Sequence, residues 1–358
     1  MPTRIGRLQK MLANECLDGL IVTSLTNMRY LCGYTGSNGM MCITRSNATF
    51  YTDFRYQEQI KDEVRGCRKR ILERDLYASF PIDDLLKSFL GRKTPRIGVE
   101  ESHLTLGRFR VLRTRLSNVK LVPVRDLVLE LRRRKTPREI ALMGRAQALT
   151  EKVFSKILKM VKPGVSERDL ALEIEYWLRR YGESAFPPIV ASGENGAKPH
   201  GRASERRIRL GDSITFDMGC RYQGYCSDMT RTVFLGKVDK EMRRVYEAVL
   251  TAQNEALVLI KPGVPCKLVD LAARDYLNRC GLGRYFGHSL GHGVGLDVHE
   301  QPSLARTSMQ ILEEGDVVTV EPGVYIPGKG GVRIEDMVLV TRSGYRNFTK
   351  VKKELMIL

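Results

Sequence analysis

Histidine, tryptophan and long apolar runs are scarce or absent in this chain of 358 residues, which has five histidines and one tryptophan. No uninterrupted apolar stretch is long enough to cross a bilayer, so we expect no membrane partner. The eight cysteines are scattered without a Cys-x-x-Cys pair, which disfavours both a zinc knot and a disulfide framework. No apolar signal core follows Met1–Arg7, so we predict a globular protein of the cytoplasm.

Basic side chains outnumber acidic ones, giving a formal net charge of +18. The excess is spread along the chain, and its densest cluster is Arg132–Lys135. Spread charge governs solubility and non-specific attraction rather than a defined binding site. We therefore expect no specific nucleic-acid partner. A non-catalytic basic binding protein remains the alternative from a different functional class.

The length of the chain allows two domains of ordinary size. Residues 1–127 alternate between helical and strand patterns, which predicts a smaller α/β amino-terminal domain. We expect a linker over 128–135 and a second domain over 136–358. In the first domain the patterns predict helices over 4–13, 54–64, 82–89 and 106–116, and strands over 19–23, 39–44, 47–52 and 96–99.

The second domain contains an internal repeat. Val161–Val165 returns 99 residues later as Ile260–Val264, with a similar pattern downstream. Two ordered copies indicate one domain with a pseudo-two-fold axis rather than a solenoid. Its patterns predict an α+β architecture, with helices over 139–162, 167–181, 239–260 and 267–280 and β stretches over 213–219, 224–235, 292–299, 316–326 and 332–341.

Carboxylates follow the same repeat. The pattern of Gly211–Asp217 returns 104 residues later in Gly315–Glu321, and a second acid, Asp228 or Glu335, follows each copy. Four clustered carboxylates without a cation would repel one another strongly. With one imidazole they provide ligands for two divalent ions, which could hold a water or hydroxide between them. Mn²⁺ and Co²⁺ suit such ligands, and Zn²⁺ is an alternative.

Four of the five histidines lie in the second domain, in segments marked by glycine or proline: His200, His288, His292 and His299. Their concentration near the four acids indicates a functional cluster rather than satisfied core residues. His103, the remaining histidine, is isolated, and we interpret it as a structural or surface residue. The sequence offers no competing Ser-His-Asp set, phosphate-binding loop or dinucleotide fingerprint.

These residues carry a resemblance to a known family. The chain resembles the creatinase/prolidase/methionine aminopeptidase superfamily with the pita-bread fold, and within it the Xaa-Pro aminopeptidase and Xaa-Pro dipeptidase (prolidase) branch. Residues 29–36 and 51–56 similarly resemble the amino-terminal domain of that branch. The segments that carry the resemblance in the second domain are 186–193, 199–200, 217–219, 224–232, 288–300, 319–325 and 331–336.

The resemblance implies two divalent metal ions and assigns roles to nine residues. The implied metal ligands are Asp217, Asp228, His292, Glu321 and Glu335. His200 and His299 would hydrogen-bond the substrate around the scissile bond, and His288 would line the pocket. Arg333 would orient the carboxylates, and we expect Glu321 also to manage the proton of the attacking water.

The sequence says less about which peptides are cleaved than about the metal site. Many prolidases carry an arginine shortly after the His-Glu-x-Pro motif, where this chain has Ser303, and serine cannot form the bidentate clamp of a guanidinium. We therefore favour an Xaa-Pro aminopeptidase, with an Xaa-Pro dipeptidase (prolidase) as the alternative, since Arg306 could take the arginine's place. In both cases the partner is a proline-containing peptide.

The amino-terminal domain carries no catalytic constellation of its own. The resemblance implies a homodimer in which the glycine-rich stretch Gly33–Gly39 reaches the partner's active site and limits peptide size. A plain hairpin connection is the alternative interpretation of this stretch.

Overall fold

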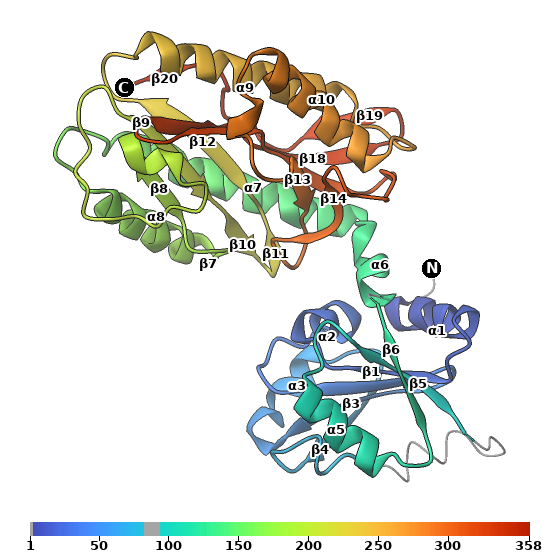
Figure 1. Cartoon of the computed structure of the whole chain (residues 1–358). Coiled ribbons are helices and arrows are strands. Elements are labelled where there is room, and N and C mark those ends of the chain that lie inside the picture. Colours follow the sequence, from blue (N-terminus) through green and yellow to red (C-terminus); the bar gives the residue numbers. More distant parts are fainter. Residues whose placement is uncertain (1–2, 82–93, 126) are drawn as a thin grey trace. The chain divides into compact units, whose positions relative to one another are not determined.

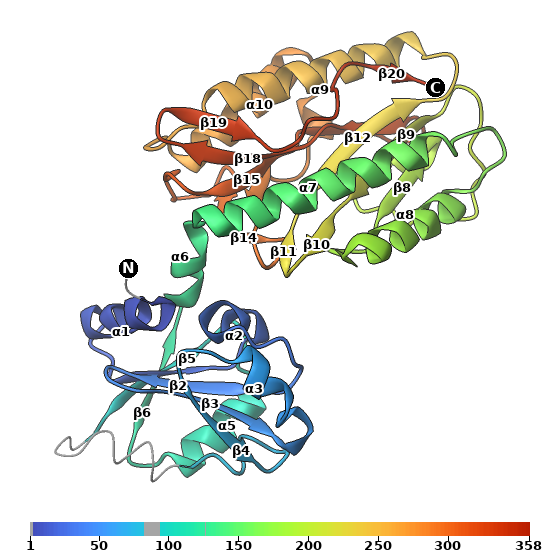
Figure 2. The same cartoon turned by 180° about the vertical axis from the view of Figure 1, so that it is seen from behind.

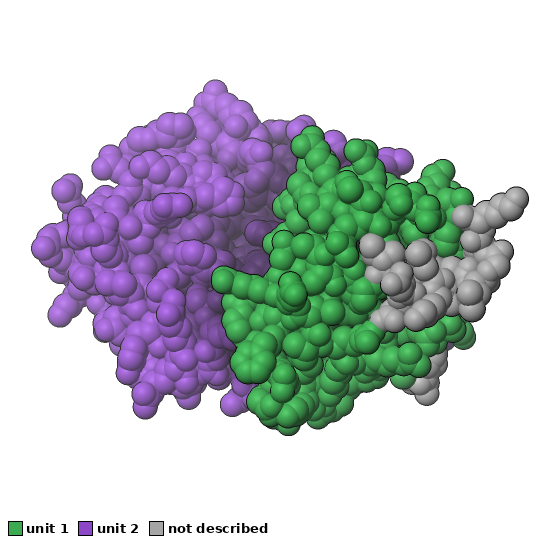
Figure 3. All heavy atoms as spheres, turned by 90° about the horizontal axis from the view of Figure 1, so that it is seen from below, with its two compact units in different colours: residues 1–132 green, residues 133–358 purple. Residues whose placement is uncertain are grey.

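The structure, a computed structural model, describes residues 3–81, 94–125 and 127–358 (Figures 1 and 2). It divides into two compact units, unit 1 (residues 1–132) and unit 2 (residues 133–358), which Figure 3 shows in different colours. The helix predicted over 82–89 lies outside the described residues. In the described ranges, no helix has the length and apolar character needed to span a membrane.

Unit 1 is built on a mixed sheet of six strands in the order β4-β3-β2-β1-β5-β6. Neighbours pair antiparallel in the β1–β2–β3 meander and parallel elsewhere, with apolar residues such as Ile21 and Ile97 in the core. The strands are β1 (Gly19–Val22), β2 (Met40–Thr44), β3 (Ala48–Asp53), β4 (Arg68–Leu72), β5 (Arg96–Glu100) and β6 (Lys120–Val124). The helices are α1 (Arg4–Asn14), α2 (Leu25–Cys32), α3 (Gln59–Glu63), α5 (Leu106–Arg115) and α6 (Leu127–Arg133).

One helix prediction for this region was wrong in detail, and the residues predicted as a linker have secondary structure of their own. The helix predicted over 54–64 is divided into a short 3₁₀ helix, η1 (Phe54–Tyr56), whose start is capped by the carboxylate of Asp53, and α3. The residues predicted as a linker, 128–135, are mostly helical as part of α6. The arginine run there suggested an exposed joint, yet Arg132 is buried and donates a 2.7 Å hydrogen bond to Asn27 Oδ1.

Four long helices enclose the sheets of unit 2: α7 (Pro137–Leu158), α8 (Glu167–Tyr181), α9 (Lys240–Val258) and α10 (Cys266–Arg279). Side-chain caps mark the starts of α7, α8 and α9. Thr136 and Glu139 form a capping box at α7, Ser166 and Asp169 do so at α8, and the side chain of Asp239 caps α9. Figures 1 and 2 both show α9 and α10 along one side of the unit and α8 at the opposite side.

The two halves of unit 2 each bury apolar helix faces against their own sheet. In the first half, α7 and α8 pack on a sheet ordered β20-β12-β9-β8; in the second, α9 and α10 pack on one ordered β14-β13-β15-β18-β19 together with the β16-β17 ribbon. The strands of the first half are β8 (Ile189–Ser192), β9 (Ser213–Met218), β12 (Met229–Phe234) and β20 (Met356–Ile357), beside the small sheet β7 (Glu183–Ser184), β10 (Cys220–Tyr222) and β11 (Tyr225–Cys226). Those of the second half are β13 (Gly291–Gly293), β14 (Glu300–Leu304), β15 (Val317–Val320), β16 (Gly323–Ile326), β17 (Gly330–Arg333), β18 (Asp336–Thr341) and β19 (Gly344–Asn347).

The β stretches predicted in unit 2 are shorter in the structure, and most of their breaks fall at functional residues. The stretch 316–326 is interrupted after β15, at Glu321, and 332–341 is interrupted between β17 and β18, around Glu335. The stretch 224–235 breaks between β11 and β12, at Asp228, while 292–299 forms a strand only at its start. Interrupting a strand frees its side chains from strict alternation, so that acids of different strands can turn toward one point.

Candidate metal centre and active site

The five predicted ligands come together from five places in unit 2. Asp217 lies near the end of β9, and the antiparallel register places it opposite Thr230 of β12. The other four ligands lie at or beside strands. They are Asp228 before β12, His292 in β13, Glu321 after β15, and Glu335 between β17 and β18. All five line one cavity of about 430 Å³, together with His200, His288, His299, Ser303, Tyr325 and Arg333.

Three of these side chains are close enough to share one ion. Ligand atoms of Asp228, His292 and Glu335 all lie within 4.8 Å of one another. Nε2 of His292 also lies 3.3 Å from Oε1 of Glu321 and 3.7 Å from Oδ2 of Asp228. The imidazole is therefore placed between one acid of each half.

Arg333 holds Asp217 in place through one of its carboxylate oxygens. Its buried guanidinium donates to Oδ2 of Asp217 at 2.6 Å, to the hydroxyls of Tyr325 and Thr230 at 2.9 and 3.1 Å, and to the carbonyl oxygen of Pro199 at 3.1 Å. Oδ1 of Asp217 is buried and has no hydrogen-bond partner among the described residues. A buried carboxylate oxygen without a donor is costly, so this atom is suited to a cation.

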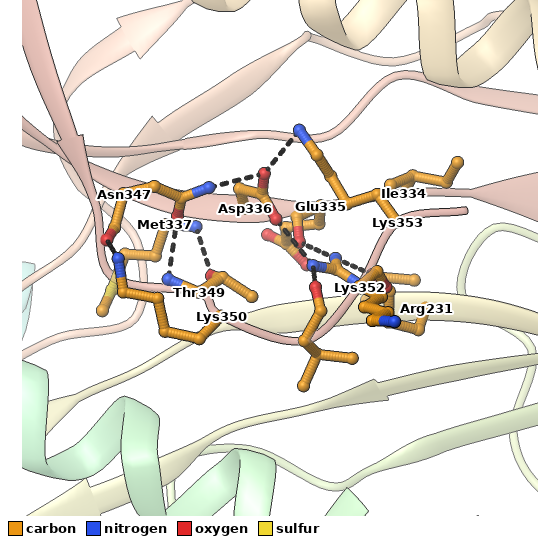
Figure 4. A network of polar contacts seen from close by, with 12 residues as sticks. Arg231, Ile334, Glu335, Asp336, Met337, Asn347, Thr349, Lys350, Lys352 and Lys353 are labelled. Carbon is orange, nitrogen blue, oxygen red and sulfur yellow. Dashed lines mark hydrogen bonds and ion pairs between the residues drawn. The ribbon is translucent and has the colours of Figure 1, made fainter.

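Glu335 is fixed through its side chain and its backbone. Oε2 accepts a 2.7 Å hydrogen bond from the hydroxyl of Thr230, and the backbone N–H donates to the carbonyl of the same residue. Figure 4 shows the guanidinium of Arg231, which donates to the carbonyl of Glu335, to the carboxylate of Asp336 and to carbonyls of the carboxyl-terminal segment. Asp336 in turn accepts from Asn347 and pairs with Lys353. This network anchors the backbone on either side of the acid.

The pKa values of three of the acids are raised and that of the fourth is lowered. Burial, and then the neighbouring carboxylates, raise the pKa of both Asp228 and Glu335 well above the usual range. Burial also raises the pKa of Asp217, although the charge of Arg333 opposes the shift. For Glu321 burial acts in the same direction, but the hydrogen bond and charge of His292 outweigh it and lower the pKa to about 2.

This donor set fits divalent metal ions. Asp228 and Glu335 are buried and repel each other, the free oxygen of Asp217 has no donor, and the neighbouring imidazole can act as a nitrogen ligand. Oxygen-rich, thiol-free ligation of this kind suits Mn²⁺, Co²⁺ or Zn²⁺.

A relay of hydrogen bonds orients His288. Arg333 donates to the hydroxyl of Tyr325, which lies 2.9 Å from Nε2 of His288, while Nδ1 lies 2.8 Å from the carbonyl of Ser289. A carbonyl only accepts, so Nδ1 carries the proton and Nε2 accepts from Tyr325. Burial lowers the pKa of His288, in agreement with this neutral tautomer.

His299 and His200 lie at the mouth of the cavity and are both exposed. The ring of His299 packs edge-on against that of His292 with centroids 4.3 Å apart. Burial, followed by the charge of His292, lowers the pKa of His299, so the ring is neutral near pH 7. Both histidines can therefore offer an N–H to a group held in the cavity.

Buried ion pairs and carboxylates hold the backbone segments that carry these histidines. Glu167, at the start of α8, accepts hydrogen bonds from Ser192 and Ser204, which flank the His200 segment. Arg274, paired with Asp270 in α10, donates to the carbonyl of His288. The residue after His299 is Glu300, which forms a fully buried 3.2 Å ion pair with Lys135. Losing one partner of such a pair costs about 3–5 kcal/mol.

Sequence patterns did not identify most of these supporting residues. Tyr325 and Glu300 lie inside the segments that resemble the family, but nothing in their periodicity indicates a partner. Thr230 and Glu335 are 105 residues apart, and their contact depends on the pairing of the halves. Ser303 lies on β14 opposite His292 and lines the cavity. Arg306, considered as a substitute for the missing arginine, is exposed and is not among the described residues that line it.

Comparison with known proteins agrees with this geometry. Residues 141–342 match the model of metallopeptidase family M24, and residues 4–134 match that of the creatinase/prolidase N-terminal domain. The chain is 43% identical to the uncharacterized peptidase YqhT of Bacillus subtilis (strain 168), over 99% of this chain and 100% of the relative.

Two solved structures are similar over nearly their whole length. One, described as an Xaa-Pro dipeptidase from Bacillus anthracis, has a TM-score of 0.94 and 39% identity, with 99% of each chain covered. The other, described as an X-Pro aminopeptidase from Thermotoga maritima MSB8, has a TM-score of 0.89 and 34% identity, with 99% of this chain and 100% of that chain covered. The predicted family and the predicted fold, a pita-bread domain after a creatinase-type α/β domain, are confirmed. The chain belongs to metallopeptidase family M24, in its Xaa-Pro peptidase branch, and this membership implies a dinuclear metal centre.

Proposed function

We propose that the protein is a metal-dependent exopeptidase that hydrolyses the Xaa-Pro bond at the amino terminus of short peptides. The observation that carries this proposal is the close set of buried Asp228, buried Glu335 and half-buried His292, in a cavity that also holds two exposed histidines. The more similar of the two structures compared is described as an Xaa-Pro dipeptidase. This description favours prolidase activity. The aminopeptidase activity that we predicted first is supported by Ser303, which stands where many prolidases have an arginine.

The residues that would hold two divalent ions are Asp217, Asp228, His292, Glu321 and Glu335. We propose Mn²⁺ or Co²⁺ as the native metal, with Zn²⁺ as the alternative. When bound, the ions lower the pKa of a water nucleophile and polarise the scissile carbonyl.

The chain's own residues then position the substrate and move the proton. Oε1 of Glu321 is engaged by Thr319 and lies near His292, which leaves Oε2 to accept the proton of the attacking water. The N–H groups of His200 and His299 stabilise the oxyanion that develops on the carbonyl.

The apolar part of the cavity wall suits proline. It includes Phe186, Pro187, Ile189 and Val298, which offer a ring-sized surface without competing donors. The imide nitrogen of an Xaa-Pro bond carries no hydrogen, so a peptidase for this bond cannot depend on that N–H. If the cavity binds the proline ring and the carbonyl beside it, no hydrogen bond from a substrate N–H is needed.

The direct test is hydrolysis of matched dipeptides by protein that has been stripped of metal and reloaded with Mn²⁺ or Co²⁺. We expect release of proline from Met-Pro or Leu-Pro, loss of activity on chelation, and little hydrolysis of Leu-Ala. Full activity of the stripped protein would refute the proposal, and binding of metal without any peptidase activity would favour the non-catalytic alternative.

The homodimer remains a proposal that rests on the family. In unit 1 the stretch Gly33–Gly39 is tied down, because Tyr34 and Thr52 both donate to the carbonyl of Asn38 and Asn38 donates to Asp53. An ordered loop of this kind could present a surface to a second copy. Sedimentation equilibrium distinguishes a dimer from a monomer, and removal of residues 35–38 should then relax peptide-length preference without loss of metal.

A further inference from the structure

One buried glutamine of α9 contacts the backbone immediately before two of the predicted metal ligands. Gln253 is completely buried, and the other buried residues of that helix are apolar or aromatic. Its side-chain nitrogen donates to the carbonyl oxygen of Val320 at 3.0 Å and to that of Ile334 at 3.2 Å. These two residues directly precede Glu321 and Glu335 in the sequence. One side chain therefore reaches both acids of the second half through their backbone.

The peptide group that joins Val320 to Glu321 is held on both sides. Its carbonyl accepts from Gln253, and its N–H, on the opposite side of the same planar group, donates to the carbonyl of Leu290 at 2.8 Å. A planar peptide group that is held at both of its polar atoms cannot rotate without losing a hydrogen bond. The Cα atom of Glu321, from which the carboxylate side chain starts, is therefore fixed in place.

The peptide group that joins Ile334 to Glu335 is held in the same way. Its N–H donates to the carbonyl of Thr230 at 3.1 Å, and its carbonyl accepts from Gln253. Ile334 lies in the gap between β17 and β18, and no backbone N–H of the described residues donates to its carbonyl. Gln253 thus supplies the donor that the interrupted strand pairing does not.

The orientation of the Gln253 amide shows that these two contacts take precedence over its own full satisfaction. Both carbonyls only accept hydrogen bonds, so the nitrogen must face them. Oε1 of Gln253 is left buried, without a hydrogen-bond partner among the described residues, which is destabilising. An apolar side chain of similar size would avoid this unpaired oxygen but would leave the two carbonyls without this donor.

We infer that Gln253 is a positioning residue of the metal centre, which sets the separation of Glu321 and Glu335 so that both acids can engage the same pair of ions. The inference rests on the metal ligands proposed above and adds a residue that is not among the described residues lining the cavity. Replacing a residue that orients metal ligands typically changes metal affinity by about tenfold to a hundredfold. The effect of Gln253 should therefore appear in metal binding itself, before any substrate is present.

The test is a titration of metal-stripped protein with Mn²⁺, in which free Mn²⁺ is followed by electron paramagnetic resonance. Gln253→Met keeps the approximate size of the side chain and removes both N–H donors, so we expect the dissociation constant of the more weakly bound ion to rise about tenfold or more. Gln147→Met is the matched control and should bind Mn²⁺ with wild-type affinity. Gln147 of α7 is equally buried, and neither its nitrogen nor its oxygen has a hydrogen-bond partner in the described part of the chain.

Gln253→Asn is the second variant, because it retains the amide on a side chain that is one methylene shorter and cannot reach both carbonyls. It should weaken Mn²⁺ binding in the same direction, and it takes the place of Gln253→Met if circular dichroism shows that Gln253→Met does not fold. Wild-type Mn²⁺ affinity in either folded variant, or equal losses in Gln253→Met and Gln147→Met, would overturn the inference. If the Gln253 variants bound Mn²⁺ more weakly than wild type but no protein cleaved an Xaa-Pro peptide, the proposed function would be refuted and this inference supported.

Discussion

The two halves of unit 2 each contribute two carboxylates to the metal centre, and in each half the two acids are compensated differently. Asp217 of the first half accepts from Arg333 at 2.6 Å, and Glu321 of the second half lies 3.3 Å from the imidazole of His292. The remaining acids, Asp228 and Glu335, have no cation within hydrogen-bond distance among the described residues. One acid in each half is therefore neutralised by the protein and one is not.

The halves also depend on each other for orientation. Arg333 of the second half holds Asp217 of the first, and Thr230 of the first half donates to Glu335 of the second. Asp217 and Glu335 are therefore each held from the opposite half, whereas Glu321 is held within its own half by Thr319 and His292. The unbalanced negative charge thus collects where the halves meet, which is where a divalent cation would contribute most.

Removing an uncompensated acid should have the largest effect. We expect Asp228→Asn to lower kcat/KM on Leu-Pro by at least about a thousandfold and to reduce bound metal, because the centre loses a charge that no side chain replaces. Asp275→Asn, a loss of an exposed acid on α10, is the control and should be nearly silent. Normal metal content and activity in Asp228→Asn would break the distinction between the two kinds of acid.

A histidine at the mouth should matter for chemistry but not for metal. His299→Ala should lower kcat by about a hundredfold to a thousandfold, as for loss of an oxyanion donor, with metal content near normal. His103→Ala, an exposed histidine in unit 1, serves as the control. If His299→Ala lost its metal instead, His299 would be a ligand and its assignment would be wrong.

The compensated acid Asp217 gives a smaller and more specific prediction. Arg333→Lys keeps the charge but cannot reach Asp217, Tyr325 and Pro199 at once, because an ammonium group lacks the planar fork. We expect kcat to fall about tenfold to a hundredfold, with weaker binding of one ion. Arg333→Met should be worse than Arg333→Lys, and equal effects would show that geometry rather than charge is decisive.

The smallest effect concerns the metal-free protein. Raised pKa values of Asp228 and Glu335 mean that the folded state binds more protons than the unfolded state, so stability falls as pH rises from about 4 through those raised values. For each extra proton bound by the folded state, the free energy of unfolding falls by about 1.4 kcal/mol per pH unit. Urea unfolding of wild type and Glu335→Gln between pH 4.5 and 7 should show a smaller decline for the variant. If the free energy of unfolding fell equally with pH in both proteins, the raised pKa of Glu335 would be contradicted.

Sequence patterns could single out the acids and histidines that the structure brings into one cavity, because each is tied to a short local signal. The Gly-Asp strand motif of Gly211–Asp217 and its copy, and the glycine-flanked histidines, can be recognised without knowledge of the fold. Contacts such as Thr230–Glu335 and Lys135–Glu300 could not be predicted, because they join residues more than a hundred positions apart whose register depends on how the halves pack. The strand breaks at Glu321 and Glu335 were missed for a related reason, since alternation continues through a bend.

The most direct test of the central claim is the number of ions bound at the meeting point of the halves. Metal-free wild type and the double variant Asp228→Asn/Glu335→Gln would be dialysed against Mn²⁺, and bound metal would be measured by elemental analysis. We predict two ions per chain for wild type and less than one for the variant, with both proteins folded. Equal occupancy in the two proteins, or no bound metal in wild type, would contradict a dinuclear centre built on these acids.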